Sequence, residues 1–433
     1  MSGFFIRQGK KRRKADACRA FLTQAEGKSA IQNRAGFGSH MPRTVKEELM
    51  EGMRKGRSSR KGFLSNFMLR PKKSERVDFL LFMLVIGLLC FGLIMLFSAS
   101  QNTSRENIYA IIIRQAGFAA LGLAAMFVTS RIDYHAYKKI AAPFFWLTIL
   151  VMYIVPAWGF ASHGATRQIS LAGFSFQPSE ICKFMLVIYF AALLSSKKHG
   201  DLSNWKSLAR YAFILVTIAG ACVLQSHLSA LLLMLAVGLV MLFGAGLPWR
   251  YVIGLGGVMA VGGGLLAWLE PYRMRRLLIF LDPFSDPRGD GWQIVNSLYA
   301  VGSGGLMGVG FGQSRQKYGY LPEAQNDYIY AIVCEELGFI GGLFVLMLFG
   351  LLIFRGMQIA FSAKDTFGNF LGFGIVSIVA LQVIVNVGVV LSVLPSTGMQ
   401  LPFFSSGGTS LIIMMAGLGI LMNISRFSTQ NKI

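Results

Sequence analysis

The sequence predicts an all-α integral membrane protein with ten transmembrane helices and one large loop between the seventh and the eighth. Hydrophobic residues make up 54% of the 433 and charged residues only 14%, whereas soluble domains carry about 25% charged residues. From residue 77 onward, apolar segments recur at the length of about 20 residues that a helix needs to cross a hydrocarbon core of about 30 Å. One long polar stretch, 270–326, interrupts them. An ordinary soluble domain is therefore excluded.

Residues 1–76 are expected to form a basic cytoplasmic tail without regular structure. They hold 20 Lys and Arg against 6 Asp and Glu and show no apolar periodicity. No apolar stretch of a cleavable signal precedes Val77, and Met41 is a second candidate start. Because the positive charge of the tail lies directly before the first apolar segment, it indicates attraction to a membrane surface, and no nucleic-acid partner is expected.

Ten apolar segments define the expected membrane domain, residues 77–427, which a short cytoplasmic tail, 428–433, follows. The helices are expected near 77–99, 108–130, 140–158, 178–196, 209–225, 229–247, 250–269, 327–354, 367–392 and 408–426. The connections 131–139, 195–210 and 354–365 are basic, so the positive-inside rule places them and both termini in the cytoplasm. The loop 270–326 then lies on the extracytoplasmic side, and loops of this length are usually functional.

Ionisable residues inside the apolar segments are costly, at roughly 2.5–3.5 kcal/mol each near a helix centre, and so mark places of structural or functional demand. Glu180 and Lys183 lie one helical turn apart, which predicts an ion pair. A structural pair and a substrate-facing pair are equally open. Glu335 and Glu336 are consecutive and cannot point the same way, so we expect one to face a cavity and the other to pair internally.

Gln382 and Asn386 form a polar stripe in the ninth segment, because residues four apart share one face of a helix. Hydrogen bonds between helices are an adequate explanation for amide side chains in this setting.

The sequence carries no pattern for a bound zinc ion or nucleotide. The five cysteines show neither CxxC nor His-linked spacing, so neither a disulfide framework nor a zinc site is expected. The glycine-rich run 300–314 lacks both a preceding strand and a Walker lysine.

Arginines near the extracytoplasmic side supply candidate anion ligands. Guanidinium groups bind phosphate oxygens bidentately. Arg273, Arg275 and Arg276 fit such a role, although anchoring of the helix at the headgroup level explains them equally well. Arg167 lies in the connection 163–177, where we expect it to bind substrate.

Three aspartates, Asp282, Asp286 and Asp290, fall within nine positions of the large loop, each near a proline or glycine. Turn formation explains Asp282 and Asp290. Asp286 differs because Gln293, Ser297 and the glycine-rich run follow it, on what is expected to be a short re-entrant helix. Glycine-rich backbone beside a carboxylate lets a bulky polar substrate approach closely.

Three blocks of the sequence resemble the signature blocks of the SEDS family, whose members include FtsW, RodA and SpoVE. The blocks are GATRQISLAGFSFQPSEICK, DPFSDPRGDGWQIVNSLYAVGSGGLMGVGFGQSRQKYGYLPEAQNDYIYAIVCEELGF and NVGVVLSVLPSTGMQLPFFSSGGTSL. The resemblance covers roughly 77–427 and implies a ten-helix fold of the SEDS type. It implies a peptidoglycan glycosyltransferase that polymerises lipid II at the outer face of the bacterial cytoplasmic membrane.

The resemblance also implies partners and a cellular role. A class B penicillin-binding protein transpeptidase is the expected partner, together with other division or elongation proteins. We expect a role in septal wall synthesis during cell division, with elongation of the RodA type and sporulation of the SpoVE type as alternatives.

By motif, the family's essential aspartate falls on Asp286, the expected catalytic residue. The expected substrate-binding residues are Arg167, Glu180, Lys183, Gln293, Ser297 and Glu323. No cofactor is required, and a divalent cation, Mg²⁺ or Mn²⁺, at Asp286 is left open. The sequence departs from the usual pattern at Gln168, Ser226, His227, Gln325, Asn326, Ser392 and Ser406, which puts the role of the usual acidic residue near His227 in doubt.

The chemistry needs a carboxylate and cations. A base takes the proton from an acceptor sugar hydroxyl as that oxygen attacks an anomeric carbon, and a lipid pyrophosphate leaves. Asp286 is expected to be the base, Arg167 and Lys183 to stabilise the pyrophosphate, and Glu180 to orient Lys183. A flippase for the lipid-linked precursor is the rival hypothesis, and a noncatalytic scaffold, the third, leaves the buried charges unexplained.

Overall fold

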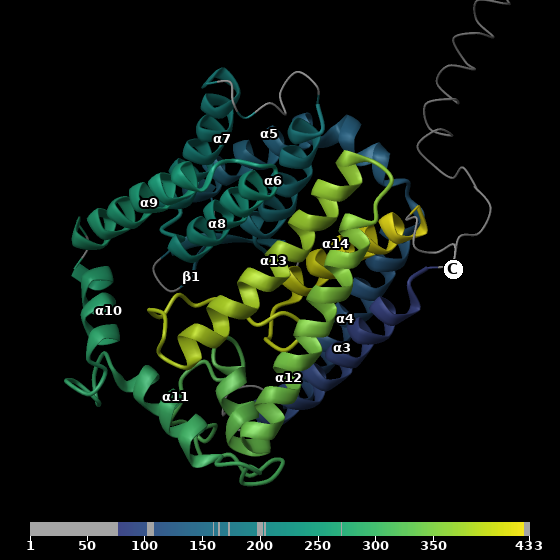
Figure 1. Cartoon of the computed structure of the whole chain (residues 1–433). Helices are drawn as coiled ribbons and strands as arrows, with labels where there is room; N and C mark the ends of the chain where they lie inside the picture. The colour runs from purple at the N-terminus through teal and green to yellow at the C-terminus, as the bar shows by residue number, and fades with distance from the viewer. Residues whose placement is uncertain are drawn as a thin grey trace, which may run out of the picture. The chain divides into compact units, whose positions relative to one another are not determined.

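The computed structural model describes residues 77–101, 108–158, 160–162, 165–171, 174–196, 202, 205–269 and 271–427. The two expected tails, 1–76 and 428–433, lie outside the described residues. The first helices are α3 (Phe79–Ala99), α4 (Ile108–Arg131), α5 (Tyr134–Trp158), α6 (Pro178–Leu194), α7 (Trp205–Leu224), α8 (Leu228–Gly244) and α9 (Trp249–Leu269). They are followed by α10 (Pro271–Leu281), α11 (Trp292–Ser303), α12 (Ile329–Phe361), α13 (Thr366–Val390) and α14 (Gly408–Arg426) (Figure 1).

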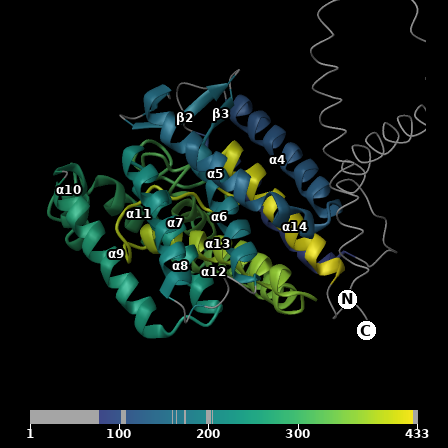
Figure 2. The ribbon, with the colours of Figure 1, turned by 90° about the horizontal axis from the view of Figure 1, so that it is seen from above.

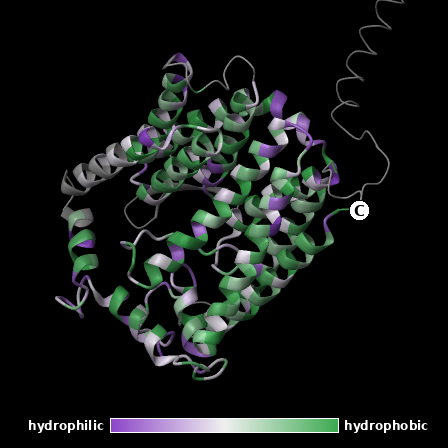
Figure 3. Cartoon of the chain, viewed as in Figure 1, coloured by the Kyte–Doolittle hydropathy of each residue, from purple (hydrophilic) through white to green (hydrophobic). Residues whose placement is uncertain are grey.

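Every apolar segment expected from the sequence forms a helix, α3–α9 and α12–α14. Most boundaries agree within a few residues, but α5 begins earlier, at Tyr134, and α12 continues to Phe361. Within the described residues, seven helices are long and apolar enough to cross a membrane, and α8 is a shorter apolar helix. Hydrophobic residues run along the helices, while hydrophilic ones gather near helix ends and connections (Figure 3). The chain is a multi-pass membrane protein, and the number of ten spans stays a prediction.

Helix α13 lies at the centre of the helical packing. It contacts α12, α6, α8 and α14, and it lies among them in both views (Figures 1 and 2). Helices α4 and α14 form the most extensive helix pair, and α3 packs along α12. Helix α9 contacts mainly α10 and α8 and lies at the edge of the described part in both views.

The connection between α5 and α6 contains a small antiparallel sheet that the sequence did not predict. Its strands are β1 (Phe160–Ser162), β2 (Ala165–Leu171) and β3 (Phe174–Phe176), in the order β1-β2-β3. Ala161 pairs with Thr166, and Ile169 pairs with Phe176. The all-α class is confirmed for the membrane-spanning part, and this sheet is an addition at one end of it.

Polar side chains join distant helices inside the bundle. Asp78 caps the N-terminus of α3 by accepting the amide of Leu81 at 2.9 Å, and its Oδ2 also accepts from Arg355 Nη2 at 2.7 Å. On another helix pair, the hydroxyl of Thr129 on α4 donates to the carbonyl of Ala416 on α14 at 2.9 Å. Asp78 is buried, and leaving its carboxylate without these partners would cost more than each bond gains.

Helix α12 is broken at Gly338, where φ is 69° and ψ is −169°. Only glycine adopts this backbone conformation without strain. The break leaves backbone groups of α12 without helical partners, and the glycine-rich loop after α11 supplies them. Val309 N donates to Glu335 O at 3.0 Å, and Phe339 N donates to Gly305 O at 2.8 Å.

The side chains of Glu335 and Glu336 hold the same loop. Glu336 forms a buried ion pair with Lys317, with Nζ 3.0 Å from Oε1, and accepts from the Ser98 hydroxyl. Glu335 accepts from Ser314 Oγ and from the amide of Arg315 at 2.9 Å. Each glutamate is 1% exposed. The prediction that one of them faces a cavity was therefore wrong, because the loop amides and Lys317 take up both carboxylates.

We expect Gly338→Ala to prevent or severely destabilise folding. A Cβ at this position would lie 2.3 Å from Gly308 N and 2.5 Å from Leu306 O, both rigid backbone atoms. Thermal unfolding of the purified protein in detergent measures the effect.

Gly350→Ala in the same helix is the control, since its Cβ would meet nothing within 4 Å. Alanine is favoured over glycine inside a helix by about 1 kcal/mol, so the control should unfold at or above the wild-type temperature. Equal unfolding temperatures for the two variants would contradict the close approach of loop and helix.

Candidate active site

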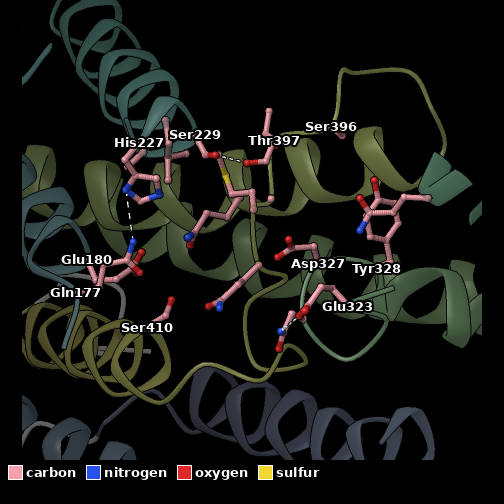
Figure 4. A pocket seen from close by; sticks show the side chains of 18 of the residues that line it. Gln177, Glu180, His227, Ser229, Glu323, Asp327, Tyr328, Ser396, Thr397 and Ser410 are labelled. Carbon is pink, nitrogen blue, oxygen red and sulfur yellow. Dashed lines mark hydrogen bonds between the residues drawn. The ribbon is translucent and has the colours of Figure 1, made fainter. Parts of the chain in front are cut away.

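A cavity of about 610 Å³ lies where α6, α8 and α13 meet the residues that precede α12 and α14. Four of the residues predicted from the sequence line it: Glu180, Lys183, Gln293 and Glu323. Figure 4 shows Gln177, Glu180 and His227 toward one end of the cavity and Glu323, Asp327 and Tyr328 toward the other, with Ser229 and Thr397 between them.

Glu180 and Lys183 form the predicted ion pair, with Lys183 Nζ 2.8 Å from Glu180 Oε2. Pro178 is the first residue of α6, which places Glu180 in the first turn, where the helix dipole favours a carboxylate. The two side chains are 4% and 13% exposed, the lysine being the more buried. A charge pair on the wall of a cavity keeps its net charge near zero until an ionic ligand competes for one member.

His227 closes the same end of the cavity. Its Nδ1 lies 3.3 Å from Ser179 Oγ and 3.4 Å from Gln177 Nε2, and the residue is 8% exposed. The resemblance left this position in doubt. In the structure, His227 binds the QPSE segment at the start of α6 and lines the cavity beside Glu180.

Glu323 has an unusual backbone at the other end of the cavity, with φ of 54°. A non-glycine residue in the left-handed region is uncommon, and such strain concentrates at functional sites. The Glu323 carbonyl accepts the amides of Asn326 and Asp327, and its carboxylate accepts from the Asn326 side chain. The backbone is thus held in a tight turn that presents residues 322–328 to the cavity.

Asp327 lines the cavity and was not predicted as a site residue. Burial, together with the neighbouring carboxylate of Glu323, raises the pKa of Asp327 to about 6, and the charge of Arg276 opposes this in part. Asn386 donates to the carbonyls of Asp327 and Met399 at 2.8 and 2.7 Å, which ties this segment to α13. The signal in the sequence is an acidic residue directly before an apolar segment.

Asp286 lies outside the lining of the main cavity, on an exposed turn. Its Oδ1 accepts from Gly289 N at 3.0 Å, and its Oδ2 accepts from Asp290 N at 3.1 Å. A Cβ at Gly289 would lie 2.1 Å from Asp286 Oδ2, so a side chain there would displace the carboxylate. A second cavity, of about 240 Å³, is lined by Gly289 and Asp290.

The two cavities adjoin one another. Residues that line both are Arg276, Gln293, Pro322 and Ser396. Gln293 is fixed by donating from Nε2 to the Pro322 carbonyl at 3.2 Å. The turn that carries Asp286 is therefore connected to the main cavity by a shared wall.

Ser297 is on the short helix expected after Asp286, α11, but it lines neither of these two cavities. Its hydroxyl donates to the carbonyl of Val390 at 2.8 Å, and the residue is fully buried. In this arrangement Ser297 serves the packing of α11 on α13.

The predicted arginines differ in position. The structure describes the backbone of Arg167 in β2 and of Arg273 in α10, but the side chains of both lie outside the described residues. Arg275 is exposed, and its Nη1 lies 3.9 Å from Asp290 Oδ2. An exposed ion pair of this kind contributes little to the stability of the fold. Arg276 lies between the two cavities and near Asp327.

The described part of the chain contains no group of three or more His, Cys, Asp or Glu side chains that would hold an ion. Each Asp286 oxygen accepts one backbone amide and keeps a further lone pair. Mg²⁺ usually binds through one or two carboxylates and completes its shell with water and substrate phosphates. The divalent cation at Asp286 therefore stays a hypothesis.

Comparisons with known proteins agree with the resemblance. A family model described as "Cell cycle protein", of the FtsW, RodA and SpoVE group, matches residues 78–430. A protein of Geobacter sp. strain M18 named "Probable peptidoglycan glycosyltransferase FtsW" is 40% identical over 359 residues, covering 82% of this chain and 98% of the relative. Stage V sporulation protein E of Bacillus subtilis is 39% identical over 363 residues, covering 82% and 99%.

Solved structures show the same fold. One, described as "Structural coordination of polymerization and crosslinking by a peptidoglycan synthase complex", has a TM-score of 0.69 and 29% identity, covering 81% of this chain and 98% of that one. The rod shape determining protein RodA of Thermus thermophilus has a TM-score of 0.62 and 27% identity, covering 82% and 98%.

We expect Lys183→Met to destabilise the protein more than the double change Glu180→Gln with Lys183→Met. The single change leaves a carboxylate without its cation, and breaking a buried pair costs roughly 3–5 kcal/mol. Because Glu180 lines the cavity and its side chain is 13% exposed, we expect a loss of stability in the lower part of this range. Thermal unfolding of the three proteins at one pH measures the difference, and a double variant less stable than Lys183→Met would exclude neutralisation as the role of the pair.

Proposed function

Because the chain belongs to the FtsW, RodA and SpoVE family of cell cycle proteins, we propose that it is a peptidoglycan glycosyltransferase that polymerises lipid II at the outer face of the cytoplasmic membrane. The observation that carries this proposal is the polar cavity of about 610 Å³ at one end of an apolar bundle, with a buried ion pair on its wall. A lipid-linked sugar pyrophosphate needs this combination, because its tail is apolar and its headgroup is both charged and rich in hydroxyls.

In the proposed mechanism, Asp286 accepts the proton of the acceptor hydroxyl as that oxygen attacks the anomeric carbon. Its two oxygens each accept one backbone amide, and a carboxylate oxygen retains a second lone pair for a hydroxyl proton. The amides hold the carboxylate in one orientation, which is what a general base requires. The adjoining cavity gives the sugar hydroxyl a route to this turn.

Lys183 stabilises the charge that develops on the leaving pyrophosphate, with Arg167 as the second proposed cation. Glu180 holds the Lys183 ammonium at the cavity wall in the absence of substrate. A double variant of Glu180 and Lys183 that is stable but inactive would assign Lys183 to substrate, whereas an active one would leave it a structural role.

We propose that both termini are cytoplasmic and that the protein acts in septal wall synthesis. The basic connections between helices support the orientation. The similarity to FtsW of Geobacter supports the septal role, and that to stage V sporulation protein E keeps sporulation as an alternative, beside elongation. Localisation of a fluorescent fusion to division sites of growing cells separates the first role from the other two.

The decisive experiment is incubation of the purified full-length protein with purified lipid II, with and without its transpeptidase partner, and separation of glycan strands by gel electrophoresis. Strand formation is expected. If the protein moved lipid II across a vesicle membrane but formed no strands, the flippase hypothesis would replace the proposed polymerase.

Asp286→Asn should leave a folded protein whose polymerisation rate falls by about 10²–10⁴-fold, the usual effect of removing a general base. Asparagine keeps the size of the side chain and one acceptor oxygen, but its NH2 group cannot accept the second of the two backbone amides that Asp286 binds. The unfolding temperature therefore reports the loss of that turn bond separately from the loss of the base. The rate of strand formation and the unfolding temperature are measured on the same preparation.

Asp282→Asn is the matched control, because Asp282 Oδ1 also accepts a backbone amide in the same loop, that of Phe284 at 3.2 Å. It should retain most of the activity. A dead Asp282 variant beside an active Asp286 variant would move the assignment to Asp282.

We further propose that a class B penicillin-binding protein packs its membrane helix on α12 and α13. The exposed apolar residues Phe344, Met347 and Leu351 follow one face of α12, at 46%, 51% and 46% exposure. The similarity to the peptidoglycan synthase complex supports a partner of this kind.

Cysteine cross-linking tests this surface. A cysteine at Met347 should cross-link to the membrane helix of the transpeptidase, while one at Phe127 on α4, which is 59% exposed, should not. Cross-links that map only to α3, α4 and α5 would place the partner elsewhere.

A further inference from the structure

Three buried polar atoms on residues that line the main cavity have no hydrogen-bond partner in the described part of the chain. They are Gln382 Oε1 on α13, Tyr328 OH, directly before α12, and the Thr397 hydroxyl. Gln382 and Tyr328 are 3% and 2% exposed.

Such atoms need an explanation, because the large majority of buried polar atoms in folded proteins are hydrogen-bonded. Hydrogen bonding between helices, which the sequence suggested for the stripe of Gln382 and Asn386, accounts only for the Asn386 amide nitrogen, and its two acceptors are loop carbonyls, those of Asp327 and Met399. Gln382 Oε1, one turn earlier on α13, is left without a donor. A ligand in the cavity would supply one.

The charges near Tyr328 indicate which kind of ligand. The carboxylates of Asp327 and Glu323 lie there with one guanidinium, that of Arg276. Two carboxylates against one cation repel a phosphate. An amide oxygen also accepts hydrogen bonds only, and a phosphate offers few donors. The chemistry favours an uncharged group that donates, such as a sugar hydroxyl or the N–H of an acetamido group.

We propose that Gln382, Tyr328 and Thr397 form a subsite that binds the N-acetylated sugar of the lipid-linked substrate through uncharged hydrogen bonds. The inference rests on the proposed function and deepens it, since it assigns the recognition of the sugar to uncharged side chains of the same cavity. In Figure 4, Tyr328 and Thr397 lie apart from Glu180.

Tyr328→Phe tests the subsite, because it removes one atom that makes no hydrogen bond within the described protein. Without substrate, the variant should unfold at or slightly above the wild-type temperature, since an unsatisfied buried hydroxyl is lost. With lipid II, KM should rise by about three- to tenfold, the worth of one hydrogen bond, with little change in kcat. Gln382→Met is the second variant, with the same expected rise in KM.

Tyr137→Phe on α5 is the matched control. The Tyr137 hydroxyl is also buried and has no partner among the described residues, but Tyr137 does not line the cavity. This variant should show the same small change in unfolding temperature and an unchanged KM.

A second measurement does not depend on activity. A ligand that binds the folded state raises the unfolding temperature, so lipid II and a polyprenyl pyrophosphate without sugars are compared as ligands. Tyr328→Phe and Gln382→Met should lower the stabilisation by lipid II and leave that by the polyprenyl pyrophosphate unchanged.

The outcomes separate the subsite from the proposed function. If the wild type polymerises lipid II and both variants keep its KM and its stabilisation by lipid II, the subsite is wrong and the function stands. If the wild type does not polymerise but lipid II stabilises it more than the variants, the subsite stands and the function falls. The subsite is also overturned if lipid II does not raise the unfolding temperature of the wild type. The same holds if the variants lose as much stabilisation by the polyprenyl pyrophosphate as by lipid II.

Discussion

The break of α12 at Gly338 is the constraint on which the functional end of the molecule depends. Inside an apolar bundle, a helix cannot leave its amides and carbonyls unpaired, because no water is present to replace the lost bonds. The loop after α11 supplies the missing partners from Gly305 and Val309. The buried Lys317–Glu336 ion pair then holds the next part of that loop against the same helix. The glycine-rich loop after α11 is thus held on α12 both by backbone hydrogen bonds and by a side-chain ion pair.

Fixing that loop also fixes the wall of the cavity. The chain leaves Lys317, makes the strained turn at Glu323 and enters α12, while Asn386 holds the carbonyl of Asp327 from α13. Residues 322–328 are thus held at both ends. The turn that carries Asp286 is held by local bonds, those of its own carboxylate to the next few amides. Under the proposed function, a rigid wall binds the substrate, and the proposed base lies on a locally stabilised turn beside it.

Hydropathy predicted the helices because their length and composition are local properties of the chain. The Glu180–Lys183 pair was predictable for the same reason, since three residues of helix bring both side chains together. Neighbours that lie far apart in sequence were not predictable. Nothing local indicates that Lys317 meets Glu336 and Ser98, so the expectation of a glutamate facing a cavity failed. Ser297 shows the same limit, because its position after Asp286 suggested substrate binding, and no local pattern indicates that its hydroxyl bonds to α13.

Three separate features agree on how a lipid-linked sugar would lie in the cavity. Lys183 is at the end formed by α6, which suits an anionic pyrophosphate once the ligand competes with Glu180 for the ammonium. The end formed by Asp327 and Glu323 repels phosphate, and Tyr328 offers an unpaired hydroxyl suited to an uncharged sugar. The wall shared with the second cavity, at Gln293, leads from that sugar end to the turn of Asp286. The reacting hydroxyl belongs to the acceptor sugar, and the turn that carries the proposed base borders the second cavity through Gly289 and Asp290. This cavity adjoins the end of the main cavity to which electrostatics assigns a sugar. Neither the ion pair nor the turn of Asp286 alone requires the pyrophosphate to lie at the α6 end and the sugar at the Asp327 end. Their agreement therefore supports this orientation of the substrate over the reverse one.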